Sequence, residues 1–211
     1  MSLTLIKIFL MVAFVGHIIC MFCDRAITYT KNGRFNFKDL SDNNKLSLLF
    51  ENTDTKRQMF SMLAGVLSLI MSCFGYIALY EYINKYSSIC GIILLISLVL
   101  LMISGTAHHV FCGVVEWFYI KFDRTEKARN AILEFFKKTS STMYVCFIGA
   151  LMFSVTLFIS IVLGLTPFPK WTCIFNVVII FILLFPFKIV GSFNLASALT
   201  FLGLFITLCL I

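Results

Sequence analysis

Long apolar segments, separated by short polar loops, run through this sequence from end to end. Residues 92–103 lie in one such segment and include no charged side chain. An α-helix needs about 20 mostly apolar residues to cross the roughly 30 Å hydrocarbon layer of a bilayer. A transmembrane barrel would instead show segments of about ten residues in which apolar and polar side chains alternate. The sequence therefore predicts transmembrane helices.

The predicted fold class is an all-α integral membrane protein, a bundle of about six transmembrane helices plus one amphipathic interfacial helix. The loops are too short for a separate soluble domain, so residues 1–211 form a single transmembrane domain. The six predicted spans are residues 3–22, 59–83, 89–120, 143–163, 171–187 and 189–211. Only Pro186, Lys188, Gly191 and Ser192 separate the last two, which leaves two spans or a re-entrant pair open for residues 171–211.

The composition excludes several function classes. Hydrophobic residues make up 60% of the chain and charged residues only 13%, whereas a soluble domain has about 25% charged residues. This excludes a soluble enzyme, a disordered chain and a nucleic-acid module, despite the net charge of +7. The sequence also has no phosphate-binding loop, nucleotide-binding glycine fingerprint or nucleophile elbow.

The basic residues predict the orientation in the membrane. Fourteen of the 17 Lys and Arg residues fall in the polar loop 23–58, in the loop after the third span, or at Lys188. Cytoplasmic loops carry an excess of such residues. We therefore expect a multi-pass protein of the cell membrane with both termini outside. The expected partners of the basic residues are anionic membrane lipids rather than nucleic acid.

Residues 124–138 predict an amphipathic helix. Ala128, Ala131, Ile132, Phe135 and Phe136 fall on one helical face, and charged residues fall on the other. Such a helix lies in the membrane interface, or it simply connects two spans. Small residues at four-residue spacing in the second and fourth spans favour close helix packing, within one chain or between two copies.

Ionisable side chains interrupt the third predicted span and are the strongest candidates for a functional site. His109 and Glu116 are seven residues apart, so a helix places them on nearly the same face. Gly105 and Gly113 flank His109 on that face and would leave a groove. A charged residue in mid-membrane costs roughly 2.5–3.5 kcal/mol. We predict that His109 and Glu116 are catalytic or ligand-binding residues that share a proton.

Further polar or aromatic residues are predicted to line a ligand site in the same interior. They are His17, Tyr76, His108, Cys112, Trp117, Asn176 and Asn194. Alternatively, the end of the third span stands among the headgroups, which makes Glu116 interfacial and Trp117 a belt aromatic. His108, His109 and Glu116 on one helix are too few ligands for a metal. His17 could complete such a site, but nothing in the sequence fixes the first helix against the third. Cys20 and Cys23 have no second cysteine pair. No metal and no cofactor are therefore predicted.

Residues 105–143 read GTAHHVFCGVVEWFYIKFDRTEKARNAILEFFKKTSSTM. With the later segments PFPKW and PFKIVGSFN, this run resembles an uncharacterised family of bacterial multi-pass membrane proteins. The resemblance implies a membrane helix bundle but assigns no residue role. The chain is also loosely similar, without a shared motif, to emopamil-binding-type sterol isomerases, which use His and Glu inside a helix bundle.

Three function classes remain open. The His/Glu site and the many aromatic residues favour a protein that binds or transforms an apolar small molecule or lipid. The short fifth span and its Pro and Gly residues favour a small transporter or channel component. A non-catalytic assembly subunit requires no cavity. A closed cavity at His109 and Glu116 indicates the first class, and a water-filled path between both faces indicates the second.

Overall fold

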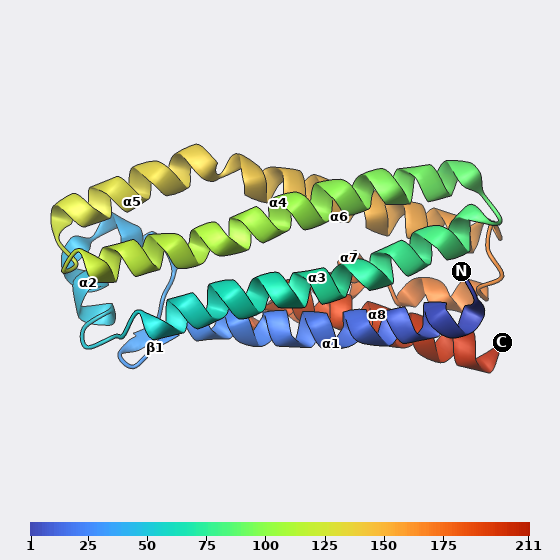
Figure 1. Cartoon of the computed structure of the whole chain (residues 1–211), viewed down its shortest axis with the longest axis horizontal. Helices are drawn as coiled ribbons and strands as arrows, with labels where there is room; N and C mark the ends of the chain where they lie inside the picture. Colours follow the sequence, from blue (N-terminus) through green and yellow to red (C-terminus); the bar gives the residue numbers. More distant parts are fainter.

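The computed structural model describes all 211 residues, and helices account for almost all of its apolar segments (Figure 1). The α-helices are α1 (Leu3–Thr28), α2 (Asn43–Leu49), α3 (Lys56–Asn84), α4 (Ser88–Lys121), α5 (Glu126–Thr139), α6 (Ser141–Val162), α7 (Val177–Leu184) and α8 (Ser192–Leu210). The 3₁₀ helices are η1 (Phe37–Ser41), η2 (Lys170–Ile174) and η3 (Phe185–Phe187), and the strands β1 (Tyr29–Thr30) and β2 (Gly33–Arg34) form a small hairpin.

Five helical segments are long and apolar enough to cross a membrane, as expected for a multi-pass protein. They are α1, α3, α4, the pair α5–α6, and α8. The fifth predicted span is wrong, because residues 171–187 form η2, α7 and η3 instead of one long helix. The apolar part, Val177–Phe187, extends only about 16 Å at 1.5 Å per residue. Asn176 starts α7, since its side chain accepts from the Val178 amide, and Lys188 ends η3 in a left-handed conformation.

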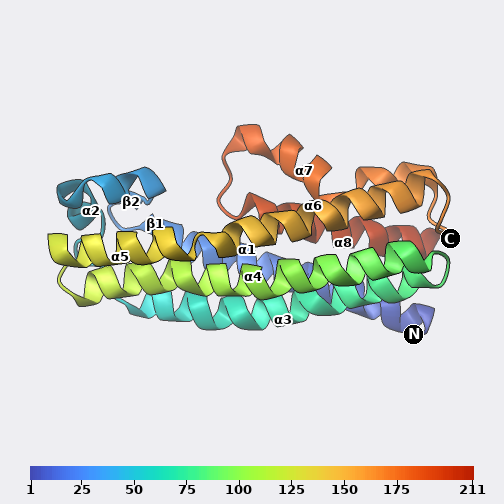
Figure 2. The ribbon, with the colours of Figure 1, turned by 90° about the horizontal axis from the view of Figure 1, so that it is seen from above.

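The short α7 also explains where the termini lie. Both termini are at the same end of the bundle, although the number of long helices is odd (Figure 1). The chain turns at residues 188–191, part-way along the bundle, and α8 returns to the end at which the chain began (Figure 2). The pair α7–α8 is thus a helical hairpin whose two outer ends lie at the same end of the bundle.

The amphipathic segment does not lie across the end of the bundle as an interfacial helix. Helix α5 runs antiparallel to α4 and continues, after a bend at Ser140, into α6 (Figures 1 and 2). Its apolar residues Ala128 and Ile132 are buried in a small core with Val115 and Tyr119 of α4. The segment is therefore a helical connector that packs on α4, the second of the two interpretations.

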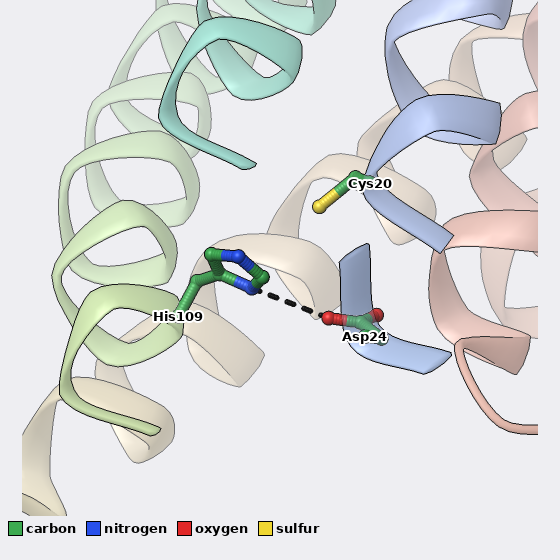
Figure 3. Close-up of side chains that lie close together, drawn as sticks. All are labelled: Cys20, Asp24 and His109. Carbon is green, nitrogen blue, oxygen red and sulfur yellow. Dashed lines mark ion pairs between the residues drawn. The ribbon is translucent and has the colours of Figure 1, made fainter. Parts of the chain in front are cut away.

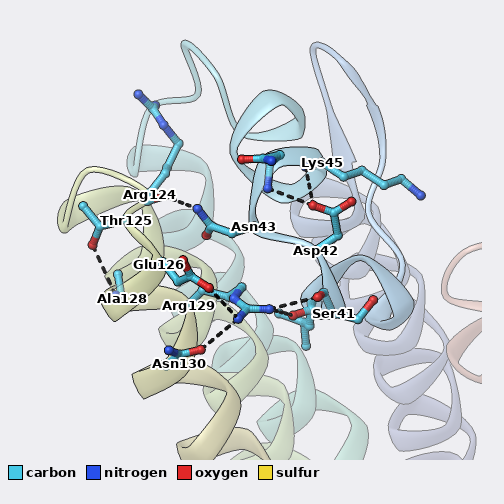
Figure 4. Close-up of polar contacts among 12 residues, drawn as sticks. Ser41, Asp42, Asn43, Lys45, Arg124, Thr125, Glu126, Ala128, Arg129 and Asn130 are labelled. Atoms are coloured by element: carbon cyan, nitrogen blue, oxygen red, sulfur yellow. Dashed lines mark hydrogen bonds and ion pairs between the residues drawn. The ribbon is translucent and has the colours of Figure 1, made fainter.

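The polar loop is folded onto the turn between α4 and α5. Arg129 donates to the carbonyl oxygens of Leu40 and Ser41, at 3.3 and 2.9 Å (Figure 4). Asn43 accepts from the Tyr119 hydroxyl and donates to the Arg124 carbonyl oxygen. This polar end holds β1, β2, η1 and α2 and lies opposite the termini (Figure 1).

Asp39 is the most buried carboxylate of the polar end. Its side chain is 3% exposed, forms an ion pair of 2.6 Å with Lys45, and accepts from the Asn36 amide at 2.9 Å. Burial alone would raise the pKa of Asp39. The hydrogen bonds from Lys45 and Asn36 outweigh burial and hold the pKa below its ordinary value of 3.8.

Glycine allows α1 and α3 to approach closely. A methyl group at Gly16 would lie 2.6 Å from the Ser68 carbonyl oxygen and 2.9 Å from the Ser72 amide nitrogen. Both neighbours are backbone atoms of α3, so only a residue without a side chain fits there. Ser68 and Ser72, two of the small residues at four-residue spacing, therefore pack within the chain. This contact fixes α1, which carries three of the residues considered below.

Candidate functional site

An elongated cavity of about 460 Å³ lies between α1, α4, α6 and the turn that precedes α8. Helix α4 supplies one wall with residues spaced three or four apart, as one helical face requires. They are Leu101, Met102, Gly105, His108, His109, Cys112, Val115 and Glu116. This stripe is about 22 Å long at 1.5 Å per residue. Sixteen of the 27 lining residues are hydrophobic.

The other walls differ in polarity along the cavity. Helix α6 contributes Met143, Cys146 and Phe147, and the turn before α8 contributes apolar residues at 189 and 190. The polar loop contributes Arg34 and Asn36. The cavity is thus mainly apolar, with polar groups from α1, α4, α8 and the polar loop, as is usual for a small-molecule site.

His109 forms its main polar contact with Asp24 of α1, not with Glu116. Nδ1 of His109 lies 3.2 Å from Oδ1 of Asp24, and both side chains line the cavity (Figure 3). The His109 side chain is 8% exposed and that of Asp24 is 26% exposed. Gly65 of α3 makes room for the imidazole, since a methyl group there would lie 2.0 Å from Nε2.

The hydrogen bonds of His109 define its protonation pattern. Nε2 lies 3.0 Å from the Ser61 carbonyl oxygen, which can only accept. Nε2 therefore carries a hydrogen and donates it. The contact between Nδ1 and Asp24 then requires one further proton, held by either the imidazole or the carboxyl group. The pair can thus hold and move a proton at Nδ1.

Asn194 connects this pair to His17. Its amide nitrogen donates to Oδ2 of Asp24 at 2.8 Å, and its amide oxygen lies 3.0 Å from Nδ1 of His17. Nδ1 of His17 is therefore the donor, which leaves Nε2 as an acceptor. That atom is buried and has no hydrogen-bond partner in the protein. The His17 ring stacks on Phe201 at 5.6 Å.

Glu116 is buried but belongs to a different contact. Its Oε2 accepts a hydrogen bond of 3.1 Å from Gln58 of α3. No hydrogen bond joins it to His109, so the predicted proton-sharing pair does not form. It lines the same cavity and is 4% exposed, which does not fit the alternative of an interfacial side chain. Gly113, predicted to widen the groove, packs instead against the Met62 side chain.

Comparison with known sequences places the whole chain in one family. Residues 1–210 match a family of unknown function (DUF6796). The chain belongs to this family. No curated protein and no solved structure matches it. The DUF6796 family assigns no activity and no residue role, so the chemistry rests on the arrangement of side chains.

The structure brings most of the predicted site residues of this DUF6796 protein to one cavity. His17, Tyr76, His108, His109, Cys112, Glu116 and Asn194 all line it. Trp117 and Asn176 do not. Trp117 stacks edge-on against Phe118 at 5.0 Å, and Asn176 donates to the Ser154 carbonyl oxygen while it caps α7. His108 makes weaker contacts, 3.3 Å to the Thr142 hydroxyl and 3.6 Å to the Cys112 sulfur.

Asp24 and Cys20 are the site residues that the sequence analysis missed. The predicted first span ends at residue 22, which places Asp24 in the polar loop. In the structure α1 continues to Thr28. Cys20 and Asp24 are four residues apart and therefore share a helical face. The signal was present in the sequence, because Asp24 is also seven residues from His17.

Proposed function

We propose that this protein binds an elongated amphiphile, a lipid or a lipid-like small molecule, in the cavity along α4. The observation that carries the proposal is the shape and polarity of the cavity. It is about 22 Å long, it is mostly apolar, and its polar groups come from a few named residues. A membrane supplies such molecules in abundance.

The stripe on α4 is apolar at one end and carries polar side chains from its middle to its other end, which suits the two parts of an amphiphile. Leu101 and Met102, with Phe147 of α6, would contact the apolar part. His109, Asp24 and Asn194 would bind the polar end through hydrogen bonds, and Glu116 would line the end nearest the polar loop. The proton at His109 and Asp24 would allow acid–base chemistry on a bound group as well as binding.

Native mass spectrometry of the gently solubilised protein tests this proposal. We expect a stoichiometric apolar molecule on the wild-type protein. Met102→Trp should displace it by filling the cavity. Ile103→Trp is the matched control, because Ile103 is adjacent on α4 but 69% exposed on the outer face. An adduct that survives unchanged in Met102→Trp would contradict the proposal.

The role of the polar residues is tested separately. His109→Ala and Glu116→Gln should each weaken binding of the same molecule, since the first removes the imidazole and the second replaces the ionisable carboxyl group by a neutral amide. Asn176→Ala is a suitable control, because Asn176 is buried but lies outside the cavity. Unchanged binding in both His109→Ala and Glu116→Gln would leave the cavity as a purely apolar site.

Transport is a second candidate, which the hairpin α7–α8 favours. Its turn ends at the cavity, where Gly191 and Asn194 line the wall. Interrupted helices that end at a site half-way through the membrane are typical of secondary transporters. Movement of the identified molecule between the two faces of proteoliposomes would support transport, whereas binding without movement would favour a receptor or an enzyme.

We also propose that the polar end faces the cytoplasm. The polar loop, with Arg34 and Lys45, and the helix α5 carry most of the basic residues, and both lie opposite the termini. The excess of positive charge on cytoplasmic segments supports this orientation. A reporter domain that works only outside the cytoplasm should therefore be active when it is fused to either terminus. A reporter that works only in the cytoplasm should be inactive there.

A further inference from the structure

Three side chains with different metal-binding atoms meet at one wall of the cavity. The sulfur of Cys20, a carboxylate oxygen of Asp24 and a ring nitrogen of His109 all lie within 4.8 Å of one another. Figure 3 shows Cys20 and Asp24 on α1, one helical turn apart, and His109 opposite them on α4. We infer that this group is a binding site for a divalent metal ion of the zinc type.

The donor atoms are close to the spacing that such an ion requires. Zinc binds sulfur at about 2.3 Å and nitrogen or oxygen at about 2.0–2.2 Å, so tetrahedral donors lie roughly 3.3–3.7 Å apart. Nδ1 of His109 and Oδ1 of Asp24 are already 3.2 Å apart. Side-chain movements of about 1 Å bring a group within 4.8 Å to this spacing.

The surroundings hold two of the three ligands in the required orientation. Nε2 of His109 donates to the Ser61 carbonyl oxygen, so Nδ1 is the nitrogen left to bind a metal, which would replace the proton shared with Asp24. Oδ2 of Asp24 accepts from Asn194, which leaves Oδ1 directed at His109. A histidine that donates its second nitrogen to a carbonyl, and a carboxylate held by a hydrogen bond, are the usual outer contacts of metal ligands.

Charge and donor type select the class of metal. A thiolate, a carboxylate and a neutral imidazole carry two negative charges, which a divalent cation neutralises within this apolar wall. Thiolate and imidazole together favour zinc and related transition metals over Mg²⁺ or Ca²⁺, which prefer oxygen ligands. Three protein ligands leave a fourth position for water or a substrate, as in catalytic zinc sites. That position would face the cavity.

The sequence alone predicts no metal site, because His109 and Glu116 occupy the same helix. The folded chain changes this by adding Cys20 and Asp24 from α1. Cys23, the other cysteine of the pair considered from the sequence, is buried but is not one of the grouped residues. It therefore provides a matched control for Cys20.

Cobalt is a suitable probe, because Co²⁺ occupies zinc sites and gives a thiolate charge-transfer band. Detergent-solubilised full-length protein is titrated with Co²⁺ and followed by absorption. We expect one Co²⁺ per chain, a thiolate band, and loss of the band when Zn²⁺ is added. Cys20→Ser should abolish the band, and Cys23→Ser should keep it. His109→Gln and Asp24→Asn should weaken binding, and Asn194→Ala should weaken it about 10- to 100-fold.

Two further variants distinguish loss of metal binding from a failure to fold and from loss of the amphiphile. Cys20→Ala, which keeps a small apolar side chain, replaces Cys20→Ser if the latter does not fold. Met102→Trp should keep the cobalt band, because Met102 is about 10 Å along α4 from His109, even though it should lose the amphiphile. A band that persists without the Cys20 sulfur, or a folded wild-type protein that gives no band, would overturn the metal site without bearing on the amphiphile.

Discussion

The contact between Gly65 and His109 predicts that Gly65→Ala destabilises the protein when the His109 imidazole is present and stabilises it when the imidazole is removed. Replacing a glycine inside a helix by alanine normally stabilises the helix, by about 1 kcal/mol. At Gly65 of α3 the added methyl group would lie 2.0 Å from Nε2, 2.4 Å from Cδ2 and 3.0 Å from Cε1 of His109. The imidazole must therefore move if Gly65→Ala is to fold.

The cost of that movement exceeds the gain in helix stability. Overpacking a well-packed site costs about 1–3 kcal/mol. Losing the hydrogen bond from Nε2 to the Ser61 carbonyl oxygen leaves a buried polar group unpaired, at about 1–3 kcal/mol. After subtraction of the helix term, Gly65→Ala should lower the free energy of unfolding by about 1–5 kcal/mol. In the His109→Ala background the same substitution should raise it by about 1 kcal/mol.

Reversible unfolding in mixed micelles with a denaturing detergent measures all four proteins of this double-mutant cycle. Gly105→Ala is the control, because its methyl group would meet only the Cys146 sulfur, at 3.1 Å. Its effect should be small and similar in both backgrounds. If Gly65→Ala stabilises the protein even when His109 is present, the imidazole does not pack on Gly65, and the placement of the whole site is wrong.

Three further predictions concern the packing and the polar contacts. Gly16→Ala should lower the free energy of unfolding more than Gly113→Ala. The methyl group added at Gly16 meets the backbone of α3, whereas the one added at Gly113 meets a flexible methionine side chain. Thermal unfolding compares the two proteins, and equal losses of stability would contradict the close contact at Gly16. Asn194→Ala should cost about 1–3 kcal/mol for each buried group it leaves unpaired, and unfolding in detergent measures this loss. The stability that Asp39 contributes should be complete above its ordinary pKa of 3.8 and should disappear as the pH falls through its lowered pKa in the folded protein. The unfolding midpoints of wild type and Asp39→Asn, compared over this pH range, should therefore converge as the pH falls.

Hydropathy was enough to predict most of the bundle. The bounds of the predicted spans 59–83, 89–120 and 143–163 lie within three residues of those of α3, α4 and α6. The orientation of α5 could not be read in this way. An apolar face that packs on α4 has the same periodicity as one that lies on a membrane, so only the tertiary contacts distinguish the two.

The candidate site was predicted from one helix only. The residues His108, His109, Cys112 and Glu116 follow from the polar interruption of an apolar span. Their partners do not, because the sequence contains no information on which face of α1 meets α4. Asp24 was missed since a charged residue near the end of an apolar run looks like the start of a loop. A search for polar residues seven apart from His17 would have found it.

The turn that follows the short α7 lines one side of the cavity. A full fifth span would continue past residues 188–191, where this turn lies. Instead Pro186 and Lys188 end the helix, and Gly191, with φ 75°, turns the chain against Met21 of α1. Arg34 of the polar loop donates to the Lys188 carbonyl oxygen at 3.1 Å and so approaches the same turn from the other side. One turn and one loop therefore line this side of the cavity. The amphiphile that we propose would lie between them and the stripe on α4, with its polar end at His109 and Asp24.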